Sequence, residues 1–250
     1  MNLSTILESH PGESPAIISR GKTFTYLDLR KQVASMRGAL HELGIGKGDR
    51  LALLCGNTIE FVIAYFACLG RGIVCVPLNP TAPAPELQRE LAVVGARAVV
   101  VAPAAVAGWS NIDRTSLPHL AHVIAATGDL EGALRFQDLV EHAPAPVVEL
   151  EPDDLAVMLF TSGTAGSPKA AMLSHGNLRS NLDQISFVRK MDGTDLVYGV
   201  LPLFHIFGLN VVLAYSLMRG SAVVLVERFD PMTAVETIRD RKVTLIPGAP

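Results

Sequence analysis

The sequence predicts an α/β fold in which mostly parallel sheets are flanked by helices. Short apolar runs rich in Val, Ile and Leu alternate with amphipathic helical patterns from one end of the chain to the other, which is typical of this class. Apolar residues make up 49% of the 250 residues and charged residues 18%, as in a globular protein with a large core. A chain of this length forms one large domain or two smaller ones.

The first 100 residues contain the clearest patterns. Thr25 and Asp28 have the spacing of a capping box and predict the start of a helix. After them, apolar residues recur at three- and four-residue intervals as far as Leu43, and Gly44 predicts the end of the helix. The other elements expected in this part are strands over 51–55, 74–76 and 98–101, and helices starting near Thr58 and Pro85.

Regularity is lost between residues 104 and 153, where only weak elements are expected, at 123–126 and 136–141. Residues 143–146, Ala-Pro-Ala-Pro, indicate an exposed connector. We therefore divide the chain into a first α/β subdomain with an irregular connector, 1–150, and the start of a second α/β subdomain, 151–250. The elements expected in the second part are strands over 156–160, 171–173, 197–201, 222–226 and 243–246, and helices from about Gly176, from about Phe207 and over 231–239.

Composition argues against several classes of function. The formal net charge of −3 provides no basic footprint for nucleic acid. Cys55, Cys68 and Cys75 lack metal-binding spacing and lie in apolar runs, so we expect reduced core residues in a cytoplasmic protein. The N-terminus lacks the pattern of a signal peptide, and the most apolar long stretch, 91–108, is interrupted by an arginine and a proline. No transmembrane segment is therefore expected.

A loop rich in glycine, serine and threonine joins two of the predicted strands and carries the strongest chemical signal. Its residues are Thr161, Ser162, Gly163, Thr164, Ala165, Gly166, Ser167, Pro168 and Lys169. The glycines let several backbone N–H groups point at one anion, the hydroxyls add donors, and Lys169 adds a positive charge suited to a phosphate. Pro168 stands where the common nucleotide-hydrolase loop has glycine, so this is a different kind of loop. The same composition is also typical of a flexible turn.

The loop resembles the TSGTTGxPKG signature of the adenylate-forming (AMP-binding) superfamily, and the chain looks like the N-terminal half of its acyl-CoA synthetases, or fatty-acid–CoA ligases. Seven of the nine loop positions match, whereas Ala165 and, just after the loop, Ala170 depart from the signature. In that family the loop holds the β- and γ-phosphates of ATP. The resemblance therefore implies that residues 161–169 bind ATP, that Lys169 is catalytic, and that Thr164 contacts Mg²⁺.

A second motif, Pro-Leu-Phe-His-Ile-Phe-Gly over residues 202–208, follows a predicted strand. A lone histidine between phenylalanines is often a core residue or the start of a helix. The segment resembles the PLFHxxG motif of the same superfamily, at the expected spacing from the loop. The resemblance implies that His205 orients the substrate carboxylate as a catalytic residue. It also implies that Phe204, His205 and Phe207 line the acyl pocket.

Other matching segments are interpreted as structural. His175 lies in a Ser-His-Gly-Asn run that resembles the family's sequence after the lysine, and we expect it to cap a helix. Asn79 and Pro80 are expected to form a turn, and Tyr26 is expected to serve only the capping of its helix. We interpret the acidic run of Glu149, Glu151, Asp153 and Asp154 as a solvated linker rather than as a metal site.

The resemblance covers nearly the whole chain but only about the first half of a family member, so the fold is expected to be incomplete at its C-terminus. It implies ATP-dependent activation of a carboxylic acid, fatty or otherwise apolar, to an acyl-adenylate, followed by thioester formation with CoA. ATP, Mg²⁺ and CoA are the implied cofactors and co-substrates. Because the C-terminal half of the family is absent, we expect this chain alone to have little or no ligase activity.

Two other functions are consistent with the same residues. One is an acyl-AMP ligase that passes its product to a carrier-protein thiol, and the other is a non-catalytic half-domain or remnant. The intact Lys169 loop argues against a remnant. Association into a homo-oligomer is compatible with the sequence, which leaves the acid, its chain length and the pathway undetermined.

Overall fold

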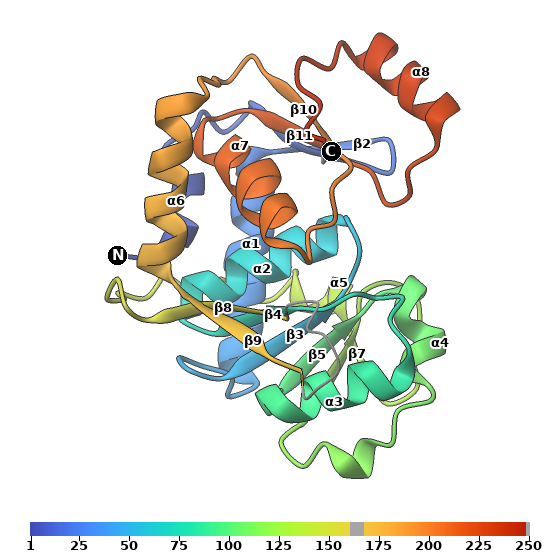
Figure 1. The fold of residues 1–250 in the computed structure, drawn as a ribbon. Helices are drawn as coiled ribbons and strands as arrows, with labels where there is room; N and C mark the ends of the chain where they lie inside the picture. Colours follow the sequence, from blue (N-terminus) through green and yellow to red (C-terminus); the bar gives the residue numbers. More distant parts are fainter. Residues whose placement is uncertain (161–167, 249–250) are drawn as a thin grey trace.

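Two β-sheets with helices packed between and outside them form the protein, as the computed structural model of residues 1–160 and 168–248 shows (Figure 1). The larger sheet has the strand order β7-β6-β5-β3-β4-β8-β9, and the smaller sheet has the order β10-β11-β1-β2. All neighbouring strands are parallel except the pairs β1–β2 and β8–β9. The predicted class, an α/β fold of mostly parallel sheets flanked by helices, is confirmed.

The elements have the following bounds. The larger sheet contains β3 (Arg50–Leu54), β4 (Val74–Pro77), β5 (Ala98–Val101), β6 (His122–Ala125), β7 (Leu134–Arg135), β8 (Leu155–Phe160) and β9 (Ala170–Ser174). The smaller sheet contains β1 (Pro15–Ser19), β2 (Lys22–Thr25), β10 (Leu196–Gly199) and β11 (Ala222–Leu225). The α-helices are α1 (Tyr26–Glu42), α2 (Ile59–Arg71), α3 (Ala84–Val94), α4 (Val106–Trp109), α5 (Phe136–Leu139), α6 (His175–Val188), α7 (Ser216–Met218) and α8 (Pro231–Arg241). The other helical segments are η1 (Leu3–Leu7), η2 (Pro103–Ala105), η3 (Arg114–Ser116) and the wide, π-type helix η4 (Phe207–Tyr215).

Both sheets combine strands from before and after residue 150. In the larger sheet β8 lies parallel to β4, with Cys75 opposite Val157, and in the smaller sheet β1 lies parallel to β11, with Ile17 opposite Val223. The proline-rich connector lies along α1, where the Ala145 N–H donates to the Ala34 carbonyl over 3.0 Å. The sheets therefore do not divide at residue 150, and the subdomain boundary stays a prediction.

Helix α2 is the centre of the molecule. It lies with α1 between the two sheets (Figure 1), and every residue from Ile59 to Gly70 is buried. A helix that is apolar on all sides is stable only when it is enclosed by other elements, and here the sheets provide the enclosure. Cys68 of α2 packs in the same core as Cys55 and Cys75, and all three thiols are free. The prediction of reduced core cysteines is thus confirmed.

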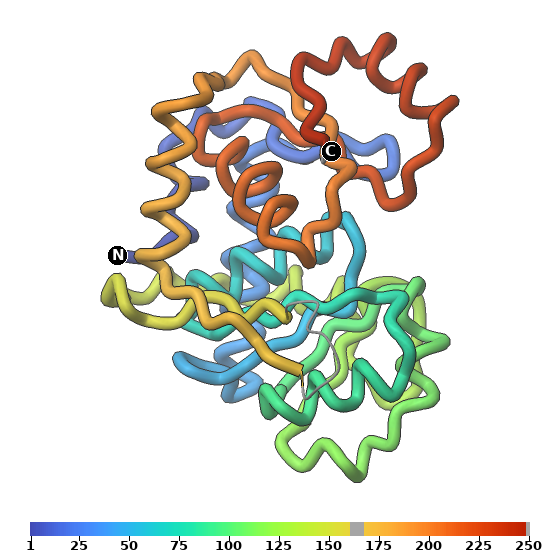
Figure 2. The backbone as a smooth tube through the Cα atoms, viewed as in Figure 1, coloured from blue at the N-terminus to red at the C-terminus, as the bar shows by residue number. Residues whose placement is uncertain are grey.

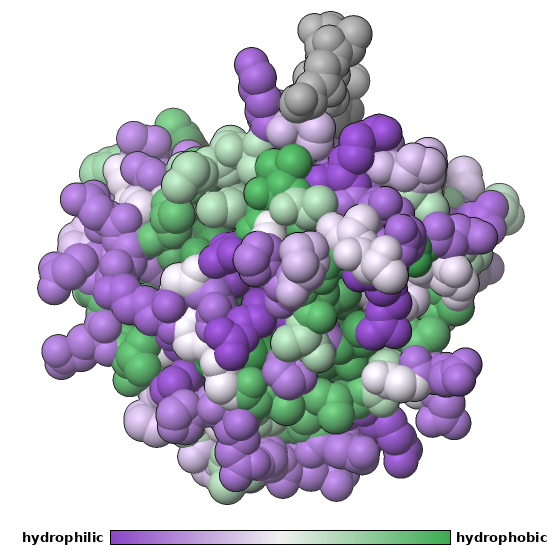
Figure 3. Space-filling view, turned by 90° about the horizontal axis from the view of Figure 1, so that it is seen from below, coloured by the Kyte–Doolittle hydropathy of each residue, from purple (hydrophilic) through white to green (hydrophobic). Residues whose placement is uncertain are grey.

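The outer face of the larger sheet has its own core. Alternate residues of β3 and β5, such as Leu54 and Val99, point away from α2 and pack against Leu87 and Leu91 of α3. Seen from below in Figure 3, polar and apolar side chains are interspersed on this side of the molecule. None of the helices within residues 1–160 and 168–248 combines the length and the apolar character needed to cross a bilayer.

Most predicted elements are present, and the capping box at Thr25 and Asp28 is confirmed with both reciprocal hydrogen bonds. The strand predicted over 243–246 is wrong, since only a single bridge, between Val197 and Leu245, forms beside β10. Tyr26 does more than start its helix: its hydroxyl donates to the carbonyls of Leu217 and Ser221, so the interpretation of a capping role alone is wrong.

The sequence analysis missed the β1–β2 hairpin. Its two-residue turn, Arg20-Gly21, has positive φ at both positions, 48° and 78°, as a tight turn that matches strand twist requires. Arginine is an unusual first residue for such a turn, so the sequence carries only half of the usual signal. The flanking strands are four and five residues long.

His175 holds the N-terminal segment against α6, and Figure 2 shows the N-terminus beside one end of this helix. Its Nδ1 accepts a hydrogen bond from the Leu3 N–H over 3.1 Å, and its ring is fully buried. The predicted capping role is wrong, because Ser174 caps α6 with a capping box and His175 is the first helical residue. Burial lowers the pKa of His175 to about 4, from an ordinary value of 6.5.

Protonation of His175 should destabilise the fold. Because its folded pKa is depressed, the unfolded chain takes up the proton first as pH falls below about 6.5, and stability is lost until pH reaches about 4. We expect a loss of up to about 3 kcal/mol across this window in urea unfolding experiments.

In His175→Gln this part of the pH dependence should disappear. His142→Gln is the matched control. The pKa of the half-buried His142 is raised, by hydrogen bonds to the Ala143 carbonyl and Glu42, so its replacement cannot reduce the loss of stability in acid. If the free energy of unfolding of His175→Gln still falls as steeply between pH 6.5 and pH 4, the loss of stability does not come from His175.

The close approach of the connector to α1 requires glycine at position 38. A Cβ there would overlap the Ala143 carbonyl oxygen, whereas the space around Gly46 is open. We expect Gly38→Ala to lower the free energy of unfolding by about 1–3 kcal/mol, despite the better helix propensity of alanine. Gly46→Ala, measured alongside by urea unfolding, should change it by less than about 0.5 kcal/mol. Equal effects of the two substitutions would rule out the steric explanation.

Candidate functional site

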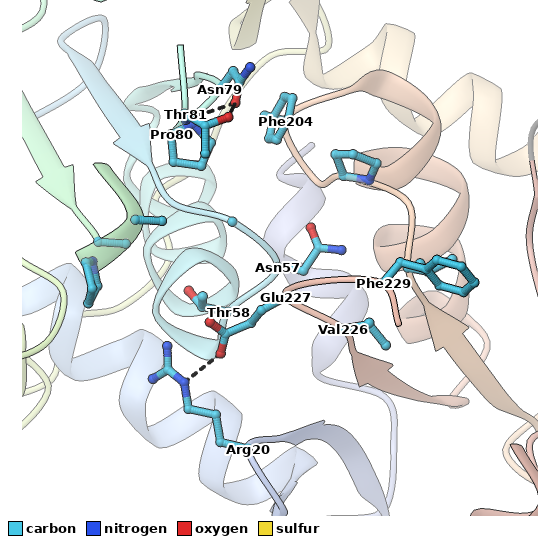
Figure 4. A pocket seen from close by; sticks show the side chains of 16 residues that line it. Arg20, Asn57, Thr58, Asn79, Pro80, Thr81, Phe204, Val226, Glu227 and Phe229 are labelled. Atoms are coloured by element: carbon cyan, nitrogen blue, oxygen red, sulfur yellow. Dashed lines mark hydrogen bonds and ion pairs between the residues drawn. The ribbon is translucent and has the colours of Figure 1, made fainter. Parts of the chain in front are cut away.

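A pocket of about 310 Å³ lies where parallel strands of both sheets end (Figure 4). Its walls come from the residues that follow β3, β4 and β5 in the larger sheet, and from those that follow β10 and β11 in the smaller sheet. In open α/β sheets ligands bind at the carboxyl ends of the strands, and here two sheets contribute such ends to one pocket. The lining side chains that Figure 4 labels are Arg20, Asn57, Thr58, Asn79, Pro80, Thr81, Phe204, Val226, Glu227 and Phe229.

Asn57 connects the two halves of this pocket. It follows β3, it is 4% exposed, and its Nδ2 donates to the carbonyls of Gly199 and Leu201, each over 3.0 Å. Its Oδ1 accepts from the Leu203 N–H over 2.9 Å. One side chain thus satisfies three backbone groups of the segment that leads from β10 to Phe204. Since buried polar groups are costly when unpaired, this segment is fixed to the larger sheet.

Arg20 and Glu227 form an ion pair at the opposite wall of the pocket, which Figure 4 shows as a dashed line. The Arg20 Nε lies 2.6 Å from Glu227 Oε1, and its Nη1 lies 3.0 Å from Glu60 Oε1, in the first turn of α2. Hydrogen bonding to Glu227 is the largest cause of the raised pKa of Arg20. These contacts join the β1–β2 turn, α2 and the residue after β11.

The second motif contributes one of its three predicted residues to the pocket. Phe204 lines it, whereas His205 and Phe207 are exposed and are not among the lining residues. The ring of His205 lies against that of Phe204, with centroids 4.5 Å apart. The glycine that ends the motif has a steric cause, because a Cβ on Gly208 would overlap the Pro202 carbonyl oxygen. The roles of His205 and Phe207 toward a substrate stay predictions.

The strand ends that flank the predicted phosphate loop lie at the same edge as the pocket. Phe160 of β8 and Ala170 of β9 form the last antiparallel pair before the connection. Because β8 runs parallel to β4 with Val157 opposite Cys75, Phe160 is level with Leu78, immediately before the pocket residue Asn79. Pro168 is half-buried and Lys169 is exposed. The other seven loop residues, Thr161 to Ser167, lie outside the described residues, and the predicted contacts with ATP are untested.

The acidic and histidine residues that the structure describes are arranged as follows. Within the part of the chain that the structure describes, no three His, Cys, Asp or Glu residues are grouped as metal ligands. In the acidic run before β8, Asp154 instead pairs with Lys47 over 2.6 Å and accepts from the Glu151 N–H. The predicted Mg²⁺ contact, Thr164, is one of the loop residues outside the description.

Sequence reasoning missed Asn57, Arg20 and Glu227. For Asn57 a signal was present, since a Gly-Asn pair directly after a buried parallel strand lies where ligand sites form. For Arg20 and Glu227 no signal exists, because their pairing joins positions 207 residues apart.

This arrangement defines a class of protein, an α/β domain with a pocket at the strand ends of two sheets. Comparison with known proteins then gives the family: residues 4–250 match the family described as AMP-binding enzyme. The chain belongs to this family. The resemblance deduced from the phosphate loop and the second motif is thereby confirmed.

Several relatives are named as CoA ligases or CoA synthases. The chain is 30% identical to 4-coumarate-CoA ligase 1 of Narcissus pseudonarcissus, over 92% of this chain and 43% of the relative. It is 32% identical to feruloyl-CoA synthase of an Amycolatopsis species, over 94% of this chain and 45% of the relative. The chain thus spans less than half the length of these relatives.

Solved structures show the same fold. The anthranilate CoA ligase AuaEII, in complex with anthranoyl-AMP, matches with a TM-score of 0.92 at 24% identity, over 98% of this chain and 49% of that one. A putative long-chain-fatty-acid CoA ligase from Rhodopseudomonas palustris matches with a TM-score of 0.90 at 26% identity, over 100% of this chain and 64% of that one.

Removal of the Asn57 amide should loosen the segment before Phe204. Asn57→Ala leaves the Leu203 N–H and two carbonyls without their buried partner, so we expect about 1–3 kcal/mol less stability and faster hydrogen exchange at the Leu203 amide. Asn79→Ala is the matched control, because the exposed Asn79 lines the same pocket and its side chain, among the described residues, bonds only to Thr81 of its own turn. An unchanged rate of hydrogen exchange at the Leu203 amide in Asn57→Ala would show that Asn57 does not hold this segment.

Proposed function

We propose that this chain provides part of the active site of an ATP-dependent acid–thiol ligase of the acyl-CoA synthetase type. The enzyme would activate a carboxylic acid as an acyl-adenylate and transfer the acyl group to CoA. The observation that carries the proposal is the pocket formed by both sheets, which Phe204 lines and beside which the strand ends flanking the Lys169 loop lie. Family membership and the CoA ligase relatives support it.

In the first step, a carboxylate oxygen attacks the α-phosphorus of ATP, and the bond to the β-phosphate oxygen breaks. The electron pair leaves with pyrophosphate. Lys169 and the loop N–H and hydroxyl groups would stabilise the charge that builds on the leaving group. His205 would orient the attacking carboxylate, and Phe204 and Phe207 would contact its apolar body.

In the second step, the thiolate of CoA attacks the acyl carbon and AMP leaves with the electron pair of the broken C–O bond.

Mg²⁺ prefers oxygen ligands, so the phosphate oxygens and the Thr164 hydroxyl would be suitable ligands for it. The bound ion would neutralise phosphate charge. The remaining catalytic groups would come from sequence beyond this chain, so we expect residues 1–250 alone to be inactive.

We further propose that the substrate is an apolar acid, either aliphatic or aromatic. With an aliphatic acid the enzyme would act in fatty-acid metabolism. The relatives support both kinds, since their names include 4-coumarate, feruloyl and long-chain fatty acid. A cytoplasmic location is proposed because three thiols are free.

ATP–pyrophosphate exchange with a panel of aliphatic and aromatic acids tests the proposal, on this chain and on a version extended along its reading frame. We expect exchange in the extended protein and a reduction of about 100-fold or more in Lys169→Ala. Lys31→Ala, which removes an exposed lysine on α1, should leave the rate unchanged.

The absence of exchange with every acid in a folded, extended protein would overturn the proposal and favour a non-catalytic domain. Acyl transfer to a carrier-protein thiol but not to CoA would assign the alternative acceptor.

A further inference from the structure

A second pocket, of about 220 Å³, lies between α8 and the smaller sheet, and we call it the α8 pocket. Its floor is a row of neighbours on three strands: Ile18 of β1 is opposite Val224 of β11, which is opposite Tyr198 of β10. The residue before each of them packs in the main core. Since side chains alternate along a strand, the floor lies on the other face of the sheet, where Figure 1 shows α8.

Helix α8 supplies the opposite wall of the α8 pocket. Thr233, Thr237 and Arg241 are spaced four residues apart, so they lie along one side of the helix. The turn of the β1–β2 hairpin adds Arg20 and Gly21 to the lining. The pocket therefore combines an apolar floor with a wall that carries hydroxyl and guanidinium groups.

The charged residues in the lining of the α8 pocket are both arginines, Arg20 and Arg241. Arg20 is already paired with Glu60 and Glu227, and neither of these carboxylates belongs to the lining. Arg241 is exposed, and it forms no ion pair with the residues that the structure describes. Arg241 therefore offers an accessible positive charge that no carboxylate of the lining neutralises.

Tyr198 adds a hydrogen-bond donor to the α8 pocket. The residue is 3% exposed, and its hydroxyl has no hydrogen-bond partner among the described residues. Burial and the nearby charge of Asp230 raise the pKa of Tyr198, so the hydroxyl keeps its proton at neutral pH. Asp230 itself lies outside the lining and accepts from the Thr233 N–H at the start of α8. The Tyr198 hydroxyl would gain a hydrogen bond from an acceptor on a bound ligand.

We propose that the α8 pocket binds a small carboxylate with an apolar body, whose oxygens accept from the Arg241 guanidinium and the Tyr198 hydroxyl. A guanidinium can bind a carboxylate through two parallel hydrogen bonds, and the floor at Ile18 and Val224 suits an apolar body. The α8 pocket shares Arg20 and Val226 with the pocket at the strand ends but is otherwise lined by different residues. The proposal does not depend on the proposed ligase activity.

Benzoate and its neutral counterpart benzyl alcohol, titrated into the chain at pH 7 with detection by amide NMR shifts, test the proposal. We expect benzoate to bind about ten-fold or more tightly than the alcohol, because only benzoate can form charge-assisted hydrogen bonds with Arg241. The shifts should include the amides of Tyr198, Thr237 and Arg241. Sodium chloride at the same concentration is the control for ionic strength.

Three variants locate the binding site. Arg241→Gln should abolish the preference for benzoate over benzyl alcohol. Arg239→Gln is the matched control: it removes an arginine of the same helix that pairs with Asp240 and lies outside the lining, so the preference should persist. Tyr198→Phe removes only the hydroxyl and should weaken benzoate binding about three-fold or more.

Several results would overturn the proposal. These are equal binding of benzoate and benzyl alcohol, shifts that sodium chloride reproduces, and an undiminished preference in Arg241→Gln. If Arg241→Gln does not fold, an unchanged affinity for benzoate in Tyr198→Phe would overturn it. Shifts confined to Asn79 and Phe204 would place the acid in the pocket at the strand ends and would overturn it as well. Because the binding test needs no turnover, a failure of the proposed ligase activity would not affect its result.

Discussion

The buried amide of Asn57 is the interaction on which the pocket at the strand ends of the two sheets depends. Asn57 follows β3, a central strand of the larger sheet, and the segment that leads from β10 to Phe204 approaches from the smaller sheet with three backbone groups that need partners. An amide supplies two donors and an acceptor in one side chain, so it satisfies all three at once. Phe204 faces the residues after β4 across the pocket because this segment is held in place.

The enclosure of α2 explains why the sheets can share a pocket at all. The helix is apolar around its whole circumference, so each sheet buries one of its sides and neither can move without exposing it. Its N-terminal turn lies at the carboxyl edge of the larger sheet, where Thr58 caps it and Glu60 points to Arg20. The pocket at the strand ends includes Thr58, the residue that caps this turn, in its wall.

Membership of the AMP-binding enzyme family gives this geometry a chemical context. A hairpin loop with a lysine is anchored by the last pair of β8 and β9, level with the ends of the other strands. Antiparallel addition of β9 to a parallel sheet is what allows so short a connection at that edge, because a parallel crossover would need a helix. The strand ends on both sides of the loop, at Phe160 and Ala170, therefore lie at the same edge of the sheet as the pocket.

The sequence by itself determined the local features: the α1 capping box at Thr25, the apolar pattern of α2, strand β5 and the two family motifs. These depend on neighbours within a few residues, which a pattern records. Only the tertiary structure decided that His175 accepts from the Leu3 N–H and that Asn57 bonds to the segment that leads from β10 to Phe204. Such contacts join residues up to 172 positions apart, and no local pattern encodes which distant group will meet a buried polar side chain.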